Sequence, residues 1–282
     1  MNIFFIVGAQ KSGTTWLQKQ LNDVSGVCCL GEGHFIDKMV GPIAEVFKDY
    51  NRMMNMVDER VYEGNGFYKV ISDESFVVHM REWILEIMLS ACDCKSDKLV
   101  AIGDKTPAHS FHMRTLIKLF PEARFIHMLR DGRDVAVSAY HHKCRILNQL
   151  NYPVETSLRD EFVSQVKKWG QFTRAVLHSE SQGLPVHTVR YESLLEDPFK
   201  QLKQCAQFVS GSDDCNDESL QKAVDLNQFN LKSGGRKPGT SDSRSFVRKG
   251  VAGSWIQELG EDLSANIEDN DQALLSKLGY SN

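Results

Sequence analysis

The stretch that decides the fold is FFIVGAQKSGTTWL, residues 4–17. An uninterrupted apolar run, residues 3–7, ends at Gly8, and residues 14–22 then place Trp16, Leu17 and Leu21 at helical spacing. An apolar run without alternation is typical of a parallel strand that is buried on both faces. The stretch therefore predicts a strand, a glycine turn and a helix.

The same order of strand and helix recurs three times downstream. The expected strands are residues 99–103, 124–129 and 185–190, followed by helices near residues 109–120, 133–147 and 198–209. Alternating strands and helices predict an α/β fold with a mainly parallel central sheet flanked by helices. No linker interrupts the chain, so we expect a single domain over residues 1–282.

Two segments do not follow this alternation. Residues 50–75 are rich in Asn, Met and Gly, and residues 230–247 are rich in Gly, Ser and basic residues. A long loop inside a compact domain is often a lid or a binding element. We expect a mobile loop at about residues 230–250 that closes over a bound ligand.

Composition limits the possible partners. The net charge of -4 argues against broad binding to nucleic acid or to an acidic membrane surface, which both require a basic surface. No apolar run approaches the roughly 18 to 20 residues of a membrane span, and we expect a cytoplasmic protein. The seven cysteines have neither zinc-ribbon nor thioredoxin spacing, which predicts reduced and mostly buried thiols.

The turn after the first strand has the composition of an anion site. A helix that begins after glycine presents unpaired backbone N–H groups and the positive end of its dipole. Gly13, Thr14 and Thr15 would supply N–H groups, Ser12 and both threonines add hydroxyls, and Lys11 adds a positive charge. The pattern predicts that a phosphate or a similar anion binds here.

The loop differs from the loop of nucleoside triphosphatases, G-x-x-x-x-G-K-[ST], at one position. Gly8 and Gly13 have the right spacing, but Thr14 stands where the lysine belongs, and the lysine lies upstream as Lys11. A triphosphatase also needs a carboxylate on a later strand to hold magnesium, whereas the strand at residues 124–129 is followed by Arg130. A nucleotide with fewer charges would fit better.

Arg130 and Ser138 form a second candidate site. An arginine at the end of a strand and a serine on the following helix can both reach one phosphate, the guanidinium in bidentate fashion. The alternative is that Arg130 pairs with Asp131 or Asp134 and that Ser138 is only packed. The segment alone leaves both interpretations open.

Three motifs, taken in order, resemble the signatures of the PAPS-dependent sulfotransferases. They are KSGTTW at Lys11–Trp16, LRDGRDVAVS at Leu129–Ser138 and RKGVAGSW at Arg248–Trp255. These enzymes use 3′-phosphoadenosine 5′-phosphosulfate (PAPS) as the donor and release 3′-phosphoadenosine 5′-phosphate (PAP). The resemblance runs over about residues 3–256, and VRYESLLEDP at Val189–Pro198 is also similar to a segment of that superfamily.

The resemblance implies a role for each matching residue, and it implies that no metal is required. A P-loop-like phosphosulfate-binding loop would hold the 5′-phosphosulfate with Lys11, Ser12, Gly13, Thr14, Thr15 and Trp16. The residues for the 3′-phosphate would be Arg130, Ser138, Arg248, Lys249 and Gly250. Lys11 would stabilise the charge that grows on the bridging oxygen of the leaving nucleotide. Cytosolic members usually carry an acidic residue before the last tryptophan, where this chain has Ser254.

The general base departs from that of the cytosolic enzymes. Those for small phenols and steroids use a histidine in a K-T-H segment, whereas this chain has Pro107 at that place and His109 two positions later. Residues 103–109 instead resemble the K-T-P-A-Y segment of heparan sulfate glucosamine 3-O-sulfotransferases. GEGHFID at residues 31–37 is similar to their E-x-H-F-F-D, and tyrosylprotein sulfotransferases also carry a catalytic glutamate in a G-E context.

This second resemblance implies that Glu32 deprotonates the acceptor. His34 and Asp37 would support Glu32, and Lys105 would contact the transferring sulfuryl group. His109 is the alternative base. The nearby pair His141-His142 with Cys144 is expected to lie at the surface rather than to bind a metal, since adjacent helical residues point in different directions.

The sequence thus predicts a sulfotransferase that acts on a hydroxyl of a sugar or a small metabolite by in-line attack on sulfur. A P-loop-type nucleotide kinase or NTPase and a non-catalytic PAP-binding protein remain alternatives. Residues 50–80 and 144–160 show no basic cluster suited to a highly sulfated polymer, which favours a neutral or modestly charged acceptor. The sequence does not determine the oligomeric state.

Overall fold

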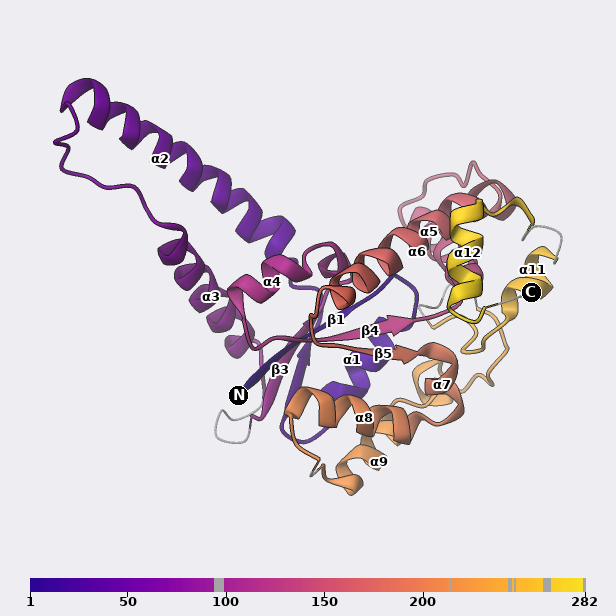
Figure 1. The fold of residues 1–282 in the computed structure, drawn as a ribbon. Helices are drawn as coiled ribbons and strands as arrows, with labels where there is room; N and C mark the ends of the chain where they lie inside the picture. Colours follow the sequence, from indigo (N-terminus) through magenta and orange to yellow (C-terminus); the bar gives the residue numbers. More distant parts are fainter. Residues whose placement is uncertain (94–98, 214, 243–244, 246, 261–264, 281–282) are drawn as a thin grey trace.

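The computed structural model is built on one five-stranded sheet whose paired strands are all parallel (Figure 1). The structure describes residues 1–93, 99–213, 215–242, 245, 247–260 and 265–280. The strands are β1 (Asn2–Val7), β2 (Val27–Leu30), β3 (Ala101–Lys105), β4 (Arg124–Leu129) and β5 (Val186–Arg190), in the spatial order β2-β3-β1-β4-β5. The predicted α/β class and its four strands are confirmed, and β2 is an addition to them.

Helices cover both faces of this sheet. Those that precede β4 are α1 (Thr14–Asn22), the π-helix η1 (Phe35–Val40), α2 (Gly41–Val61), α3 (Asp73–Ser90), the 3-10 helix η3 (Pro107–Phe111) and α4 (Met113–Leu119). Those that follow β4 are α5 (Gly132–Gln149), α6 (Leu158–Ser181), α7 (Tyr191–Glu196), α8 (Pro198–Ser210), α9 (Asp217–Leu226), α10 (Phe229–Lys232), α11 (Ser254–Leu259) and α12 (Asp269–Lys277).

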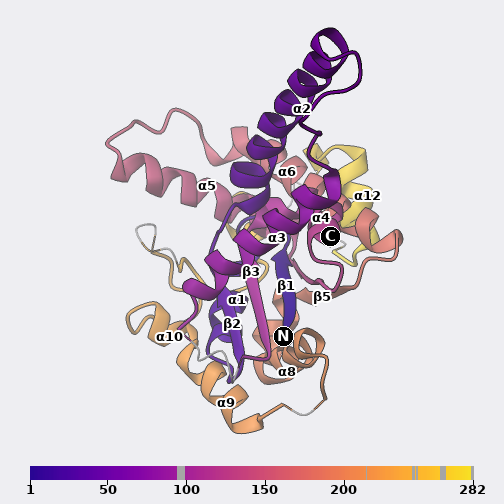
Figure 2. The same cartoon turned by 90° about the vertical axis from the view of Figure 1, so that its left-hand side faces the viewer.

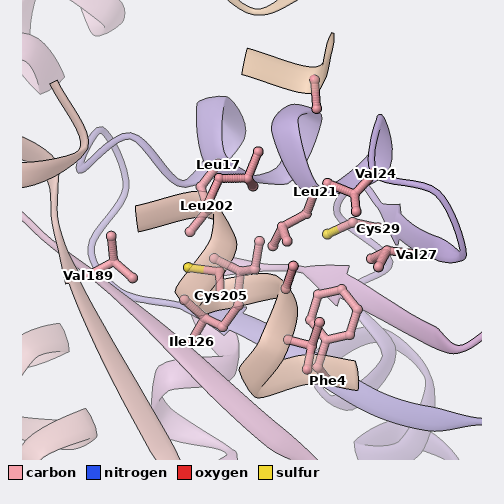
Figure 3. Packing of buried hydrophobic residues seen from close by; sticks show 14 of the residues in the cluster. Phe4, Leu17, Leu21, Val24, Val27, Cys29, Ile126, Val189, Leu202 and Cys205 are labelled. Atoms are coloured by element: carbon pink, nitrogen blue, oxygen red, sulfur yellow. The ribbon is translucent and has the colours of Figure 1, made fainter. Parts of the chain in front are cut away.

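Strand β1 shows how the sheet divides the core. Phe4 and Ile6 point to one face, where they join buried residues of α1, α8 and α9. Phe5 points to the other face, where α3 and α4 pack against the sheet. Figure 3 shows the first cluster, with Leu17 and Leu21 of α1 beside Leu202 and Cys205 of α8. A strand that is buried on both faces explains why the run at residues 3–7 is apolar without alternation.

A third cluster joins the end of the chain to the middle. It packs α5 and α6 against α11 and α12, with Trp169 and Trp255 among its buried side chains. The C-terminal third motif is thereby brought next to the helix that follows β4.

Helix α2 projects from the body of the molecule, and the chain returns from its far end to α3, which packs against the sheet (Figures 1 and 2). None of the residues of α2 is buried. Residues 50–75 were expected to fall outside the regular elements, but residues 50–61 complete α2 and residues 73–75 begin α3. Asn and Met are compatible with a helix, and the glycines that interrupt helices begin only at Gly64.

The expected loop at residues 230–250 begins within α10 and is tied to its own end. The Arg236 guanidinium donates to the carbonyl oxygens of Thr240 and Arg248, and the Gly239 N–H donates to the Lys249 carbonyl oxygen. Residues 243–244 and 246 lie outside the described residues. Mobility and closure over a ligand stay a prediction.

The described cysteines are less uniformly buried than expected. Cys28, Cys29 and Cys205 are buried, whereas Cys92, Cys144 and Cys215 are partly exposed. Cys94 lies outside the described residues.

Within the described ranges, none of the helices combines the length and the apolar character that a membrane crossing requires. The cytoplasmic location stays a prediction.

We expect Leu21→Ala to lower the free energy of unfolding by about 2–5 kcal/mol, because it leaves a cavity in the cluster between α1 and α8. Val46→Ala on α2, at a side chain that is 66% exposed, is the control and should change it by about 0.5 kcal/mol or less. Urea unfolding followed by circular dichroism measures both. Similar losses for the two variants would contradict the described core.

Candidate active site

The loop between β1 and α1 is shaped by two glycines with positive φ. Gly8 has φ +129°, and a Cβ atom there would lie 2.5 Å from the Met128 carbonyl oxygen. Gly13 has φ +98°, and a Cβ atom there would lie 2.7 Å from the ring of Tyr191. Both positions require glycine because the loop presses against β4 and α7. Gly13 is the N-cap of α1 and supplies no side-chain cap, so the first N–H groups of the helix are available to a ligand.

A cavity of about 280 Å³ opens in front of this loop. It is bounded by the start of α1, the turn after β2, the end of β3, the middle of α5, α7, and the two ends of the segment 227–250. The residues that line it are Gln10, Lys11, Gly13, Thr14, Thr15, Trp16, Lys19, Glu32, Pro107, Arg130, Ser138, His142, Tyr191, Leu195, Asn227, Phe229, Lys232, Val247, Arg248, Lys249 and Gly250.

Lys11 is crowded by other cations. Burial first, and then the positive charges of Arg145, Arg130, Lys105 and Arg248, lower the pKa of Lys11 to about 8. Each of these charges disfavours the protonated lysine, and a bound anion would reverse that effect. The charges around Lys11 therefore fit a multiply charged anion.

Two buried polar atoms next to Lys11 also fit an anionic ligand. The Ser12 hydroxyl and the Arg130 Nε have no hydrogen-bond partner among the described residues. A buried polar group without a partner costs roughly 1–3 kcal/mol. Both groups can donate, so an anion with several acceptor oxygens would satisfy them.

Arg130 is held at the cavity by three contacts. Its guanidinium lies over the Tyr191 ring, 4.1 Å from the ring centre, donates to the Val251 carbonyl oxygen at 3.0 Å and lies 3.4 Å from Asp134. The ion pair with Asp134 that the sequence left open is therefore present, and Arg130 lines the cavity as well. Asp131 pairs instead with Arg133, at 2.8 Å.

The third motif reaches the same cavity from the far end of the chain. Arg248, Lys249 and Gly250 line the cavity together with Arg130 and Ser138 of the second motif. The Arg248 Nη1 and the Lys249 Nζ donate to one oxygen of Glu258 on α11, at 2.6 and 2.7 Å. The structure thus brings all three motifs together.

Glu32 and Lys105 form an ion pair at the edge of the cavity. The Lys105 Nζ lies 2.5 Å from the Glu32 Oε1, and the His34 Nε2 lies 3.5 Å from the Glu32 Oε2. The His34 Nδ1 in turn lies 3.3 Å from the Asp37 carboxylate. Burial by itself raises the pKa of Glu32, but the hydrogen bond and charge of Lys105, with those of His34, outweigh burial and lower it. Glu32 is therefore an ionised carboxylate that can accept a proton.

Asp104, at the end of β3, fixes the loop that carries Glu32. Its buried carboxylate accepts hydrogen bonds from the Gly33 N–H at 2.9 Å and from the Thr106 hydroxyl at 2.7 Å, and the His109 Nε2 lies 3.1 Å away. His109 is completely buried and does not line the cavity. This burial favours Glu32 over His109 as the general base, and the identity of the base stays a prediction.

The two adjacent histidines, which were expected at the surface, are both half-buried. His142 lines the cavity from α5, and the His141 Nε2 lies 2.7 Å from Glu258. Burial first, and then the charges of Lys11 and Arg145, lower the pKa of His142 to about 4, so its ring is neutral at pH 7. The signal in the sequence was the helical spacing from Ser138 to His142 and Arg145, which puts them on one face.

Tyr191 is another functional residue that the sequence analysis missed. Its ring contacts Gly13, stacks under Arg130 and meets Trp16 edge-on with ring centres 5.8 Å apart. It lies within VRYESLLEDP, directly after β5. The position after a strand that neighbours β4 was the available signal.

In the part of the chain that the structure describes, no group of three or more His, Cys, Asp or Glu side chains could hold a metal ion.

A parallel sheet with a glycine turn and a helix N-terminus after its first strand defines an α/β protein of the P-loop-like kind. The model of the sulfotransferase family matches residues 4–211. The chain belongs to the sulfotransferase family.

Curated relatives with sulfotransferase names are similar to the chain. It is 25% identical to cytosolic sulfotransferase 3 of Arabidopsis thaliana, over 58% of this chain and 55% of the relative. It is 27% identical to the omega-hydroxy-beta-dihydromenaquinone-9 sulfotransferase Stf3 of Mycobacterium bovis, over 74% and 63%. For protein-tyrosine sulfotransferase 1 of Danio rerio the identity is 26%, over 74% and 53%. The chain thus spans about half to two thirds of the length of these relatives.

Solved structures share the fold. Mouse sulfotransferase SULT7A1 complexed with PAP superimposes with a TM-score of 0.58 at 18% identity, covering 99% of this chain and 85% of that chain. Retinol dehydratase in complex with androsterone and PAP gives 0.51 at 17% identity, covering 97% and 80%. The predicted resemblance to sulfotransferases and the single α/β fold are therefore confirmed.

We expect the reactivity of Lys11 to follow its lowered pKa. Competitive acetylation, read by peptide mass spectrometry, should show Lys11 half-reactive near pH 8, because only the neutral amine reacts. Arg145→Ala removes a positive charge near Lys11, so the midpoint should move to higher pH. Arg52→Ala, on an exposed turn of α2, is the control and should leave it unchanged. An unchanged midpoint in Arg145→Ala would contradict the described electrostatics.

Proposed function

We propose that the chain transfers the sulfuryl group of PAPS to an acceptor hydroxyl. The observation that carries the proposal is the crowding of cations around Lys11 at the N-terminus of α1, in a protein of net charge -4. Positive charge that is concentrated in one cavity of an acidic protein serves a local anion rather than a polyanionic surface. PAPS carries negative charge at both ends of the nucleotide. The cavity has cations from all three motifs that would pair with these charges.

The residues divide between the two ends of the donor. The loop Lys11–Trp16 would hold the 5′-phosphosulfate, with the Ser12 hydroxyl and the N–H groups of α1 as donors. Arg130, Ser138 and Arg248–Gly250 would hold the 3′-phosphate. The donor supplies an activated sulfur–oxygen bond, and Lys11 would stabilise the negative charge on the bridging oxygen when that bond breaks. PAP then leaves as the product, and the chemistry that we propose uses no metal.

Glu32 is the group that we assign to the acceptor proton. The acceptor oxygen would bond to sulfur while its proton passes to the Glu32 carboxylate, opposite the breaking bond to the 5′-phosphate. Lys105 now holds Glu32, and an arriving sulfuryl group offers Lys105 a second anion. Contact of Lys105 with that group would weaken its bond to Glu32 and raise the basicity of the carboxylate. His34, supported by Asp37, would keep Glu32 oriented.

The acceptor that we propose is a hydroxyl of a sugar or a small metabolite. The curated relatives carry names for acceptors as different as a menaquinone derivative and protein tyrosine, so the names favour no single class. A screen with ³⁵S-labelled PAPS against neutral and singly charged alcohols, phenols and sugars would identify the acceptor class. A chain that binds PAP and labels none of them would be a non-catalytic PAP-binding protein.

We expect PAP to bind without magnesium and ATP to bind far more weakly. Lys11 stands before Gly13 rather than after it, so the loop lacks the lysine that triphosphate loops place there. Isothermal titration calorimetry of PAP and ATP, each with and without magnesium, measures the preference. Tight, magnesium-dependent ATP binding with none for PAP would establish the kinase or NTPase alternative instead.

We expect Glu32→Gln to leave PAP affinity within about 2-fold and to cut sulfuryl transfer by about 10²-fold or more, because the amide cannot take the proton. Calorimetry measures the affinity, and the labelled-PAPS assay with the best acceptor of the screen measures transfer. Glu45→Gln on α2, where the side chain is 72% exposed and pairs with Lys48, is the charge-matched control. Equal transfer by the two variants would exclude Glu32 as the base.

A further inference from the structure

Glu258 pairs with Arg248 and Lys249, the two basic side chains of the third motif that would hold a 3′-phosphate. One carboxylate oxygen, Oε1, accepts from the Arg248 Nη1 at 2.6 Å and from the Lys249 Nζ at 2.7 Å. The other oxygen, Oε2, lies 2.7 Å from the His141 Nε2 on α5. A single side chain therefore engages both basic residues of the third motif and ties them to the helix that carries Ser138.

These contacts are shielded from solvent. The side chains of Arg248, Lys249 and Glu258 are 10%, 14% and 17% exposed. Charges at such positions interact much more strongly than exposed pairs do, because water screens them less. Burial by itself raises the pKa of Glu258, but the hydrogen bonds from His141, Lys249 and Arg248 outweigh burial and hold the pKa far below its ordinary value. Glu258 is ionised at neutral pH.

The helix that carries Glu258 is itself fixed. Asp134 of α5 accepts hydrogen bonds from the Gly253 N–H at 2.7 Å, from the Trp255 N–H at 3.1 Å and from the Ser254 hydroxyl at 3.2 Å. These bonds hold the start of α11 against α5. Glu258, one turn further along α11, is thus aimed at Arg248 by the backbone rather than by a flexible loop.

The carboxylates reduce the net positive charge that an anion would meet at this subsite. Arg248 and Lys249 bring two positive charges, and Glu258 neutralises one of them. Arg130, the other candidate cation for the same phosphate, lies 3.4 Å from the Asp134 carboxylate. A phosphate carries about two negative charges at pH 7. To bind there, it has to displace the Glu258 carboxylate from Arg248 and Lys249 or bind beside it against charge repulsion.

We propose that Glu258 is a built-in counter-ion that sets the affinity of the 3′-phosphate subsite, a proposal that rests on the proposed function. In the free protein Glu258 keeps Arg248 and Lys249 ordered at the cavity and offsets one of their two positive charges. When a 3′-phosphate enters, its oxygens share or replace the Oε1 contacts. The carboxylate then weakens phosphate binding and speeds the release of PAP. Glu258 acts on the phosphate through the two cations, so it is a positioning and affinity-setting residue, not a catalytic one.

The experiment compares PAP with 5′-AMP, which lacks the 3′-phosphate. Calorimetry gives both affinities, and stopped-flow displacement gives the release rate of PAP, for the full chain and for Glu258→Gln. We expect Glu258→Gln to bind PAP about 5-fold more tightly or better, with slower release, and to bind 5′-AMP unchanged, because only the 3′-phosphate meets the freed charges. The melting temperature of the nucleotide-free variant should fall, since two buried cations lose their counter-ion. Added PAP should raise the melting temperature of the variant more than it raises that of the parent chain.

Two further variants separate charge from structure. Glu258→Asp keeps the negative charge on a shorter side chain and should bind PAP within about 2-fold of the parent chain. Glu268→Gln removes the same charge from an exposed pair with Lys167 and should change neither affinity. If Glu258→Gln binds PAP equally or more weakly, or tightens 5′-AMP as much as PAP, the inference is overturned while the proposed function stands. If the parent chain binds no PAP, the proposed function fails and the inference falls with it.

Discussion

The ring of Tyr191 positions three parts of the cavity wall. One edge of the ring lies so close to Gly13 that no side chain fits between the loop and α7. One face carries the Arg130 guanidinium at 4.1 Å, and Trp16 meets the ring edge-on. An aromatic face attracts a cation without neutralising it, so Arg130 is held in place and still carries charge for a ligand. The anion loop, the arginine after β4 and the first turn of α1 are positioned by the same side chain.

Electrostatics then explains why the cavity needs carboxylates as well as cations. Burial first, and then the neighbouring cations, lower the pKa of Lys11, so the charged form of this lysine is destabilised in the cavity. Asp134 and Glu258 offset part of this destabilisation from outside the phosphate positions, as Glu32 does for Lys105 on the acceptor side. These carboxylates therefore stabilise a basic cavity in the absence of a bound anion.

Much of the fold followed from local pattern. The double-sided apolar run of β1, the glycine turn and the helical spacing of α1 predicted the first unit within one residue of its bounds. The same reasoning missed β2, because a four-residue strand with two cysteines has too few residues to show a period. It missed the second half of α2 because that helix buries no face, and composition alone suggested a loop. Periodicity predicts elements that pack on the core, and these two elements gave it too little signal.

The sequence by itself determined which chemistry is present: the three motifs, their order and the resemblance that follows from them all lie in short contiguous segments. The tertiary structure decided which residues meet. His141 and Glu258 are separated by 117 positions, and Gly33 and Asp104 by 71, and no spacing rule connects them. The physical reason is that pairs within an element are set by helical or strand geometry, whereas pairs between elements depend on how the sheet orders its strands and on how α11 packs against α5. The displaced Lys11 was visible in the sequence, but the cations around it and the carboxylates that balance them came only with the fold.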